Sequence, residues 1–172
     1  MPKVVINMPE GPNSEIIRYL NDKHAVGWAL IDHEPRSTAA ARADVLVGGH
    51  GLKSSEIVKV VLLCKSPRLG RKQWSLVVLP AKQYIRMELA RDEFGGRVRL
   101  ATESEIKERT PWCQLGCLPA LGGLLQVPQY VDPRVLSGEA VVFPAGVPSQ
   151  SIRLAINDLK VVETDLTVAM LS

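Results

Sequence analysis

Residues 115–123 constrain the fold more than any other stretch, because they combine three glycines and a proline with almost no polar side chain. Surface loops are usually rich in Asn, Asp and Ser, whose side chains satisfy the peptide groups of a turn. Here the glycines allow positive φ and close backbone approach, whereas Pro119 fixes φ and lacks an N–H group. The segment is therefore either a buried connection between two elements or a loop that presents peptide groups to a pocket walled by Leu115, Leu118 and Leu121.

The length and composition are those of a globular protein. The chain has 172 residues, of which 46% are hydrophobic and 23% are charged, so it can form a core and is unlike disordered or coiled-coil proteins. No apolar run approaches the roughly 18 residues of a membrane-spanning helix. The N-terminal residues lack the apolar core and cleavage site of a secretory signal. We expect one domain over residues 1–172, cytoplasmic and without a membrane partner.

The three cysteines, Cys64, Cys113 and Cys117, are an odd number for a set of disulfides and suit a reducing compartment. Cys113 and Cys117 are four residues apart, but no second pair or nearby histidine completes a zinc site. Buried free thiols are the favoured interpretation, and we expect no metal and no cofactor. The net charge of +3 permits a nucleic-acid partner without indicating one, so the position of the charges matters more than their sum.

Hydrophobic periodicity and turn residues predict an α+β fold with a mixed sheet. Caps are expected at Ser14, at Ser37 or Thr38, and at Asn157, and the sequence from Thr102 to Glu105 matches a capping box. The expected helices cover residues 14–23, 38–48, 81–94, 102–109 and 158–163. The expected strands cover residues 3–8, 25–32, 57–64, 74–79, 97–101, 127–131, 140–143 and 151–156.

Lys59 interrupts residues 57–64, a β-branched apolar run that is the clearest strand in the sequence. A lysine in such a strand either lies on a solvated face or extends its ammonium past an edge into water. Alternatively, it places an ammonium at a pocket, where it can hold a phosphate or a carboxylate.

The strands at residues 57–64 and 74–79 are expected to pair as an antiparallel hairpin. Their connection carries four positive charges and no negative one, at Lys65, Arg68, Arg71 and Lys72. Such a segment is either a solvated loop or a contact for the phosphate backbone of a nucleic acid.

Sequence motifs of common enzyme classes are absent. The chain has no P-loop, dinucleotide-binding fingerprint, His-Glu-x-x-His or Gly-x-Ser-x-Gly. The three histidines (His24, His33 and His50) lie in the first third of the chain. A Cys–His pair stays open, because its members need only meet in space.

Three groups of residues, taken together, resemble the YbaK/EbsC family, the prolyl-tRNA synthetase-associated editing domain. These are residues 57–63, residues 116–122, and Val131-Asp132 followed by residues 143–146 and 151–154. His33-Glu34-Pro35 before a helix of small residues also fits the opening of the family. The resemblance covers about residues 14–160.

This resemblance implies a mixed, strongly curved β-sheet with flanking helices, and hydrolysis of the ester between a wrong amino acid and the 3′ adenosine of tRNA. Lys59 is in the position of the family's essential lysine, which holds the 3′-terminal nucleotide. Gly116 belongs to the loop whose backbone groups polarise the substrate and water. The family is thought to use no protein nucleophile, and a ribose hydroxyl or a thiol of the substrate assists instead. Positioning and backbone polarisation can suffice, because an aminoacyl ester is already labile.

The resemblance also implies the other site residues and the partners. Substrate-binding residues are expected at His33, Thr38, Leu118, Pro119, Ala120, Gly122 and Gly146, and tRNA-binding residues at Lys65, Arg68, Arg71 and Lys72. The expected partners are an aminoacyl-tRNA, such as Cys-tRNA(Pro) or Ala-tRNA(Pro), and prolyl-tRNA synthetase, with no DNA.

Two departures from the family pattern bear on which amino acid is removed and on whether deacylation persists. The second proline of the loop is replaced by Ala120, and residues 144–146 read Pro-Ala-Gly instead of Gly-Ala-Gly. Two alternatives stay open. One is a non-catalytic module of the same fold that binds tRNA or a synthetase, and the other is a thiol or metal protein that uses the three cysteines.

Overall fold

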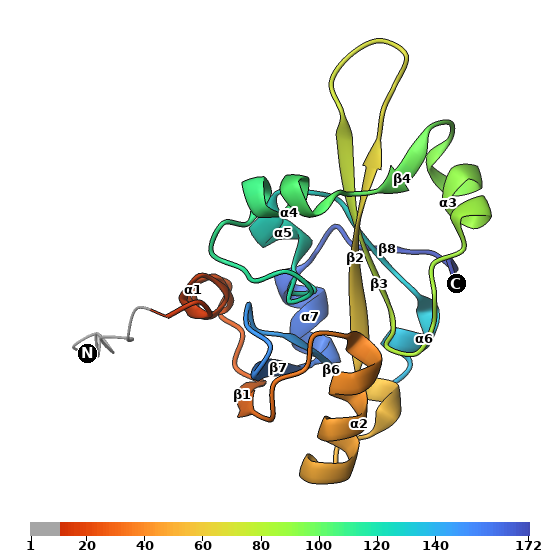
Figure 1. The fold of residues 1–172 in the computed structure, drawn as a ribbon. Coiled ribbons are helices and arrows are strands. Elements are labelled where there is room, and N and C mark those ends of the chain that lie inside the picture. Colours follow the sequence, from red (N-terminus) through yellow and green to blue (C-terminus); the bar gives the residue numbers. More distant parts are fainter. Residues whose placement is uncertain (1–10) are drawn as a thin grey trace.

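The computed structural model describes residues 11–172, so the strand expected at residues 3–8 lies outside the described part. The α+β class is confirmed (Figure 1). The helices are α1 (Ser14–Asp22), α2 (Ala39–His50), α3 (Met87–Phe94), α4 (Glu103–Arg109), α5 (Gly122–Leu125), α6 (Pro133–Leu136) and α7 (Ile156–Val162). The strands are β1 (Trp28–Asp32), β2 (Val58–Lys65), β3 (Gln73–Pro80), β4 (Val98–Leu100), β5 (Gln129–Val131), β6 (Ala140–Pro144), β7 (Gln150–Ala155) and β8 (Thr167–Val168).

The strands form two sheets. The larger sheet has the order β4-β2-β3-β5-β8, with antiparallel pairs around β2 and parallel pairs around β5, so the expected mixed sheet is confirmed. The smaller sheet, β1-β7-β6, is antiparallel. A parallel bridge between Ile57 and Val142 joins the start of β2 to β6. The strong curvature of the sheet stays a prediction.

The expected antiparallel hairpin is confirmed, and it is the longest strand pair of the fold. Its register pairs Lys59 with Leu79 at one end and Lys65 with Gln73 at the other. In Figure 1 the loop between the two strands extends well beyond the other elements. Residues 66–72 are therefore far from the centre of the fold, while the lower half of the hairpin is part of the core.

Side chains on β2 alternate between two apolar layers. Val58 packs with Ala120 and Leu121 on one face, whereas Leu63 packs with Leu79 on the other. Successive side chains of a strand point to opposite faces, and both faces of this strand are covered. The continuous apolar run of β2 in the sequence is the consequence.

Helix α2 begins as the sequence predicts but ends later. Thr38 does cap α2, because its hydroxyl accepts a hydrogen bond from Ala41 N–H at 3.2 Å. However, α2 continues through Gly48 and Gly49 and ends at Gly51, which has φ +64°. A glycine inside a helix costs only about 1 kcal/mol, while the residue after the last turn often needs the left-handed conformation.

The caps expected at Ser14 and Asn157 were wrong. Ser14 is already the first residue of α1, and Asn13 precedes it without a side-chain cap. Helix α7 begins at Ile156, directly after β7, and Ala155 provides no cap. The capping box is confirmed, because Thr102 and Glu105 exchange both of its hydrogen bonds.

The helix expected at residues 81–94 is shorter, because α3 begins only at Met87. The preceding residues form a turn whose peptide groups bind other segments. Ala81 N–H donates to Ile57 O at 2.9 Å, and Arg86 N–H donates to Leu171 O at 2.7 Å. These partners are distant in sequence and therefore could not be found from local pattern. Among residues 11–172, no helix is long and apolar enough to cross a membrane.

Glu163 is a buried carboxyl group that joins α7 to two other segments. It accepts a hydrogen bond from Gly123 N–H at 2.9 Å and another from the Tyr19 hydroxyl at 2.9 Å. Burial raises the pKa of Glu163 above its ordinary value of 4.5, although the Gly123 N–H and the Tyr19 hydroxyl oppose that rise. The folded protein therefore holds this proton to a higher pH than the unfolded chain does.

Wild-type protein should lose stability as the pH rises above 4.5, because Glu163 then releases its proton more easily in the unfolded chain. We predict that this loss is smaller in the Glu163→Gln variant. In the wild type, the free energy of unfolding falls from that pH until the pH passes the raised pKa of the folded state, because the unfolded chain releases the proton first. Glutamine keeps an acceptor for Gly123 N–H but does not titrate. Urea unfolding at several pH values measures the slope, with the exposed Glu93→Gln variant as control. Equal slopes for wild type and Glu163→Gln would contradict the prediction.

Candidate functional site

The loop of residues 115–123 is attached to a second loop by two backbone hydrogen bonds. Gln114 N–H donates to Gly146 O at 2.9 Å, and Gly146 N–H donates to Cys117 O at 3.2 Å. Gly146 has φ +85°, and a Cβ atom there would lie 2.9 Å from Pro12 O. Both peptide groups of Gly146 thus bind protein, so this expected substrate-binding residue holds the loop in place.

The C-terminal half of the loop is held by Gln129 of β5, whose side chain is buried. Its Nε2 donates to Ala120 O at 3.0 Å, and its Oε1 accepts a hydrogen bond from Gly122 N–H. A Cβ atom on Gly122 would lie only 2.8 Å from Gln129 Cβ. This half of the loop therefore serves as a buried support, and it contains Pro119, Ala120 and Gly122. It corresponds to the first of the two interpretations of the loop, a buried connection between two elements.

Gly116 is exposed and passes close to the start of α2. It has φ +78°, and a Cβ atom there would lie 2.8 Å from Ser37 O. Its N–H group donates to no acceptor among residues 11–172. Gly116 therefore presents a peptide group outward, as the alternative interpretation of the loop required.

Opposite this loop, β2 has an open edge. Leu62 O accepts a hydrogen bond from Ala101 N–H at 2.9 Å, and Val58 O accepts one from Arg42 Nη2 at 3.4 Å. Residues two apart on a strand direct their peptide groups to the same side. The N–H and C=O groups of Val60 therefore point to this edge, where Val60 pairs with no strand in the described part of the chain.

An apolar pocket of about 190 Å³ lies at this edge. Its lining comes from β2, β4, α4 and the loop, mainly through Val60, Leu62, Leu100, Ile106, Gly116 and Leu118. No charged side chain lines it. The site thus combines a small apolar pocket with outward peptide groups, and it brings two of the expected site residues together, Gly116 and Leu118.

The side chain of Lys59 points to the face of β2 opposite to that of Val58 and Val60, because successive side chains of a strand alternate between its faces. Its Nζ donates to Gln83 O at 2.7 Å and lies 4.1 Å from the centroid of the Tyr84 ring. Partial burial lowers the pKa of Lys59 below its ordinary value. The structure therefore shows no contact between Lys59 and Gly116, and the terminal part of a substrate would have to cross the edge of β2 to reach both.

His33 and Thr38 have structural contacts. His33 is buried and bonded through both ring nitrogens, to Glu34 O at 2.9 Å and to the Ser151 hydroxyl at 2.8 Å. Burial lowers the pKa of His33, so the ring is neutral near pH 7. Thr38 uses its hydroxyl as the cap of α2. Both residues shape the segment that Gly116 contacts.

Arg42 is a residue of this region that the sequence analysis missed. Its side chain on α2 is only 2% exposed, and its Nε and Nη1 atoms have no hydrogen-bond partner among residues 11–172. Burial lowers the pKa of Arg42 to about 10. Its position four residues after Thr38 and four before Leu46 could have placed it on the buried face of the helix, but the surrounding alanines concealed that pattern.

The cysteines are buried free thiols, as expected. Burial raises the pKa of Cys113 to about 12, and it also raises that of Cys117, although the positive charge of Arg42 opposes the rise at Cys117. Both thiols are therefore protonated near neutral pH and are poor nucleophiles. Within residues 11–172, no group of three or more His, Cys, Asp or Glu side chains could hold a metal ion.

The four basic residues of the hairpin have different environments. Lys65 donates to Phe94 O at the C-terminal end of α3, and Lys72 forms an ion pair with Glu105 at 3.1 Å. Arg68 and Arg71 are exposed and form no ion pair within the described residues. Two of the four expected tRNA contacts are thus available at the surface without breaking an internal contact.

Comparison with known proteins identifies the family. The model of the aminoacyl-tRNA editing domain matches residues 33–161. The chain belongs to the aminoacyl-tRNA editing domain family. The matched segment of this editing domain contains Lys59, the whole loop of residues 115–123, and Gly146. No curated protein matches the sequence.

Solved structures share the fold of this editing domain at low sequence identity. One is a candidate trans-editing enzyme for prolyl tRNA synthetase, with 22% identity, a TM-score of 0.77 and coverage of 96% of this chain and 99% of that one. Another is the hypothetical protein APE2540, with 20% identity, a TM-score of 0.74 and coverage of 90% and 97%. At these identities the similarity establishes the fold alone.

We predict that Gly116→Ala destabilises the editing domain more than Gly96→Ala does. The two glycines have nearly equal φ values, +78° and +77°, but only at Gly116 would the new Cβ atom meet a backbone oxygen. The left-handed conformation costs about 1–2 kcal/mol at either position, and the contact with Ser37 O adds to this cost at Gly116. Urea unfolding measures the loss of stability in each variant, and the difference between the two losses is the cost of the contact with Ser37 O. Equal losses of stability would mean that Gly116 is not held against Ser37.

Proposed function

We propose that this protein is a trans-editing deacylase of the cytoplasm that hydrolyses the ester of a mischarged tRNA, such as Cys-tRNA(Pro) or Ala-tRNA(Pro). One observation carries the proposal. An apolar pocket lies between the open edge of β2 at Val60 and the outward peptide group of Gly116. Prolyl-tRNA synthetase is the proposed partner, on the strength of the name of the similar trans-editing structure.

In this proposal, the side chain of the wrong amino acid enters the pocket of about 190 Å³. The absence of charged lining residues favours a small uncharged side chain. The carbonyl oxygen of Val60 accepts a hydrogen bond from the amino group of the substrate. The Gly116 N–H group donates to the ester carbonyl oxygen and stabilises the negative charge that develops there, as backbone donors do in other acyl-transfer sites.

Hydrolysis then needs no protein nucleophile. A water molecule, assisted by the neighbouring ribose hydroxyl or by the thiol of a cysteinyl substrate, attacks the ester carbon. The bond from the acyl carbon to the ribose oxygen breaks, and the ribose oxygen leaves with a proton from the water. The protonated state of the buried thiols supports this route, because it disfavours a cysteine nucleophile.

Lys59 is proposed to anchor the terminal nucleotide on the far side of the β2 edge. Its ammonium has three N–H groups, and one of them donates to Gln83 O. The other two can meet a phosphate or ribose oxygen. Tyr84 lies under the ammonium and is 78% exposed, so its ring is available to a base.

The non-catalytic alternative rests on the exposed arginines of the hairpin, Arg68 and Arg71, which could bind tRNA without any hydrolysis. The departure from the family pattern at Ala120 does not favour this alternative. Ala120 is fully buried in the core and holds Gln129 through its carbonyl oxygen, and it does not line the apolar pocket.

We predict that the protein hydrolyses alanyl and cysteinyl esters of tRNA(Pro) and leaves aspartyl and arginyl esters intact. A charged side chain in an apolar pocket without a partner costs more than about 3 kcal/mol, which corresponds to a rate lower by more than about a hundredfold. A panel of mischarged tRNAs, followed by release of the labelled amino acid, measures this selectivity. Tight tRNA binding with no hydrolysis of any ester would favour the non-catalytic alternative.

We predict that Lys59→Met lowers deacylation by about tenfold or more, because a charge-assisted contact to phosphate contributes about 1.5–3 kcal/mol. Lys82→Met is the matched control, since Lys82 is an exposed lysine of the adjacent turn that pairs with Asp44 on the surface. Both variants should unfold at temperatures close to that of the wild type. Equal activities of the two folded variants would remove Lys59 from the mechanism.

A further inference from the structure

A second and larger hollow of the surface also lies beside α4. This groove has a volume of about 790 Å³ and is formed by the loop end of the β2–β3 hairpin, α4, the segment after α4, and α5. The side chains that give it its character are Arg71, Lys72, Trp74, Arg109, Trp112 and Leu124. Two indole rings and three basic side chains thus converge on one cavity that the proposed ester site does not use.

Arg109 and Trp74 form a stacked pair inside the groove. The guanidinium carbon of Arg109 lies 4.9 Å from the centroid of the Trp74 ring. One nitrogen, Nη2, donates to Leu125 O at 3.4 Å, while Nε is buried and has no partner among residues 11–172. The pair holds a planar cation against an aromatic ring, and both groups are surfaces on which a nucleic-acid base can stack.

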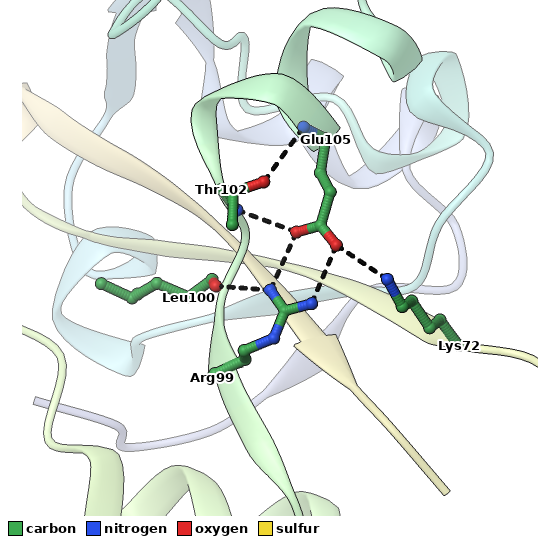
Figure 2. Close-up of polar contacts among 5 residues, drawn as sticks. All are labelled: Lys72, Arg99, Leu100, Thr102 and Glu105. Atoms are coloured by element: carbon green, nitrogen blue, oxygen red, sulfur yellow. Dashed lines mark hydrogen bonds and ion pairs between the residues drawn. The ribbon is translucent and has the colours of Figure 1, made fainter.

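The wall of the groove is fixed by Glu105, as Figure 2 shows. Its carboxylate accepts two hydrogen bonds of 2.8 Å from Arg99 and one of 3.1 Å from Lys72. It also completes the capping box with Thr102 at the start of α4. Glu105 therefore ties α4 to β4 and to the hairpin, so the groove between these elements has a defined shape.

The charges of the groove favour an anionic ligand. The Arg99 guanidinium holds the pKa of Glu105 far below its usual range, so this carboxylate stays ionised and balanced by Arg99 and Lys72. Arg71 and Arg109 then face the single remaining carboxylate among the lining residues, that of Glu108. Arg71 is exposed and forms no ion pair within the described residues, so it is free to meet a phosphate group.

We propose that this groove binds the unpaired nucleotides that precede the terminal adenosine of the tRNA acceptor end. The inference rests on the proposed function and extends it to a second subsite. Unpaired bases can stack on Trp112 and on the Arg109–Trp74 pair while their phosphates meet Arg71. Bases within a duplex stack on one another and cannot enter such a cavity, so the groove is suited to a single strand.

The position of the groove agrees with this path. Helix α4 is the wall that the two cavities share, with Ile106 lining the apolar pocket and Arg109 lining the groove. Residues three apart on a helix are neighbours on its surface, so the two cavities lie next to each other along α4. A strand whose ester lies at Gly116 therefore reaches the groove by passing this part of α4, and beyond the groove Arg68 at the hairpin tip faces the paired stem.

Tryptophan fluorescence tests the groove without any need for hydrolysis. The chain has three tryptophans, and Trp28 of β1 lies outside the groove, so Trp28→Phe leaves the two groove tryptophans as the signal. We expect the trinucleotide CCA to quench this fluorescence at low salt and a short RNA duplex of equal phosphate content to quench it much less. No quenching by CCA, or equal quenching by the duplex, would overturn the proposal.

Two substitutions in the Trp28→Phe background separate stacking from charge. Arg109→Lys keeps the positive charge but removes the planar group, and we expect CCA affinity to fall by about tenfold. Arg71→Gln lies at an exposed position, so folding is not at risk, and it should reduce the log–log salt slope by about 0.7. Lys82→Gln should change neither quantity, because Lys82 follows the end of β3 opposite to the groove residue Trp74. Wild-type affinity and salt slope in both groove variants would contradict the proposal.

Short esters then distinguish this inference from the proposed function. Arg109→Lys should raise KM for an aminoacyl-CCA trinucleotide and leave that for aminoacyl-adenosine unchanged, because only the longer substrate reaches the groove. Equal effects on both would contradict the groove. Failure of the wild type to hydrolyse either ester would refute the proposed function, while the CCA titrations would still decide the groove.

Discussion

A loop buried inside a protein must find partners for its peptide groups, and the arrangement of this domain depends on how residues 115–123 do so. Apolar side chains cannot provide those partners, so they come from other segments: Gly146 for the first half of the loop and Gln129 for the second. Once these bonds are made, the loop has little freedom. The N–H group of Gly116, which donates to no acceptor within residues 11–172, is then held at the surface, which is what a site that acts through backbone polarisation requires.

The strand β2 arranges the other parts of the site along one line. Lys59 and Lys65 are six residues apart, which corresponds to roughly 20 Å of extended chain. Between them lie the open edge at Val60 and the pairing with β4, and beyond Lys65 the hairpin extends outward (Figure 1). The aromatic groove and then the basic tip lie on the same side of the apolar pocket, in the order in which the proposed unpaired nucleotides and paired stem follow the ester. A single strand therefore sets the spacing of all the proposed contacts.

Local chemistry predicted much of the fold, and its failures have a common cause. The strands of the hairpin, the cap at Thr38 and the capping box at Thr102 were found because neighbouring residues determine them. The turn before α3 was missed because Ile57 and Leu171, which bind its peptide groups, are distant in sequence. The same limit applies to the site. Sequence placed Gly116 and Leu118 in one loop, but it could not show that Lys59 points to the opposite face, or that Trp74 and Arg109 meet.

Arg42 is a residue at which selection for stability and selection for function should favour different side chains. A guanidinium that is fully buried with one long hydrogen bond costs free energy that an apolar side chain of similar length would not. Libraries selected for thermal stability alone should therefore replace Arg42 early, whereas its neighbour Leu46 on the same helix face should be retained. Recovery of arginine under selection for translational accuracy would then reveal a benefit of this charge beyond the one hydrogen bond that Arg42 makes within residues 11–172.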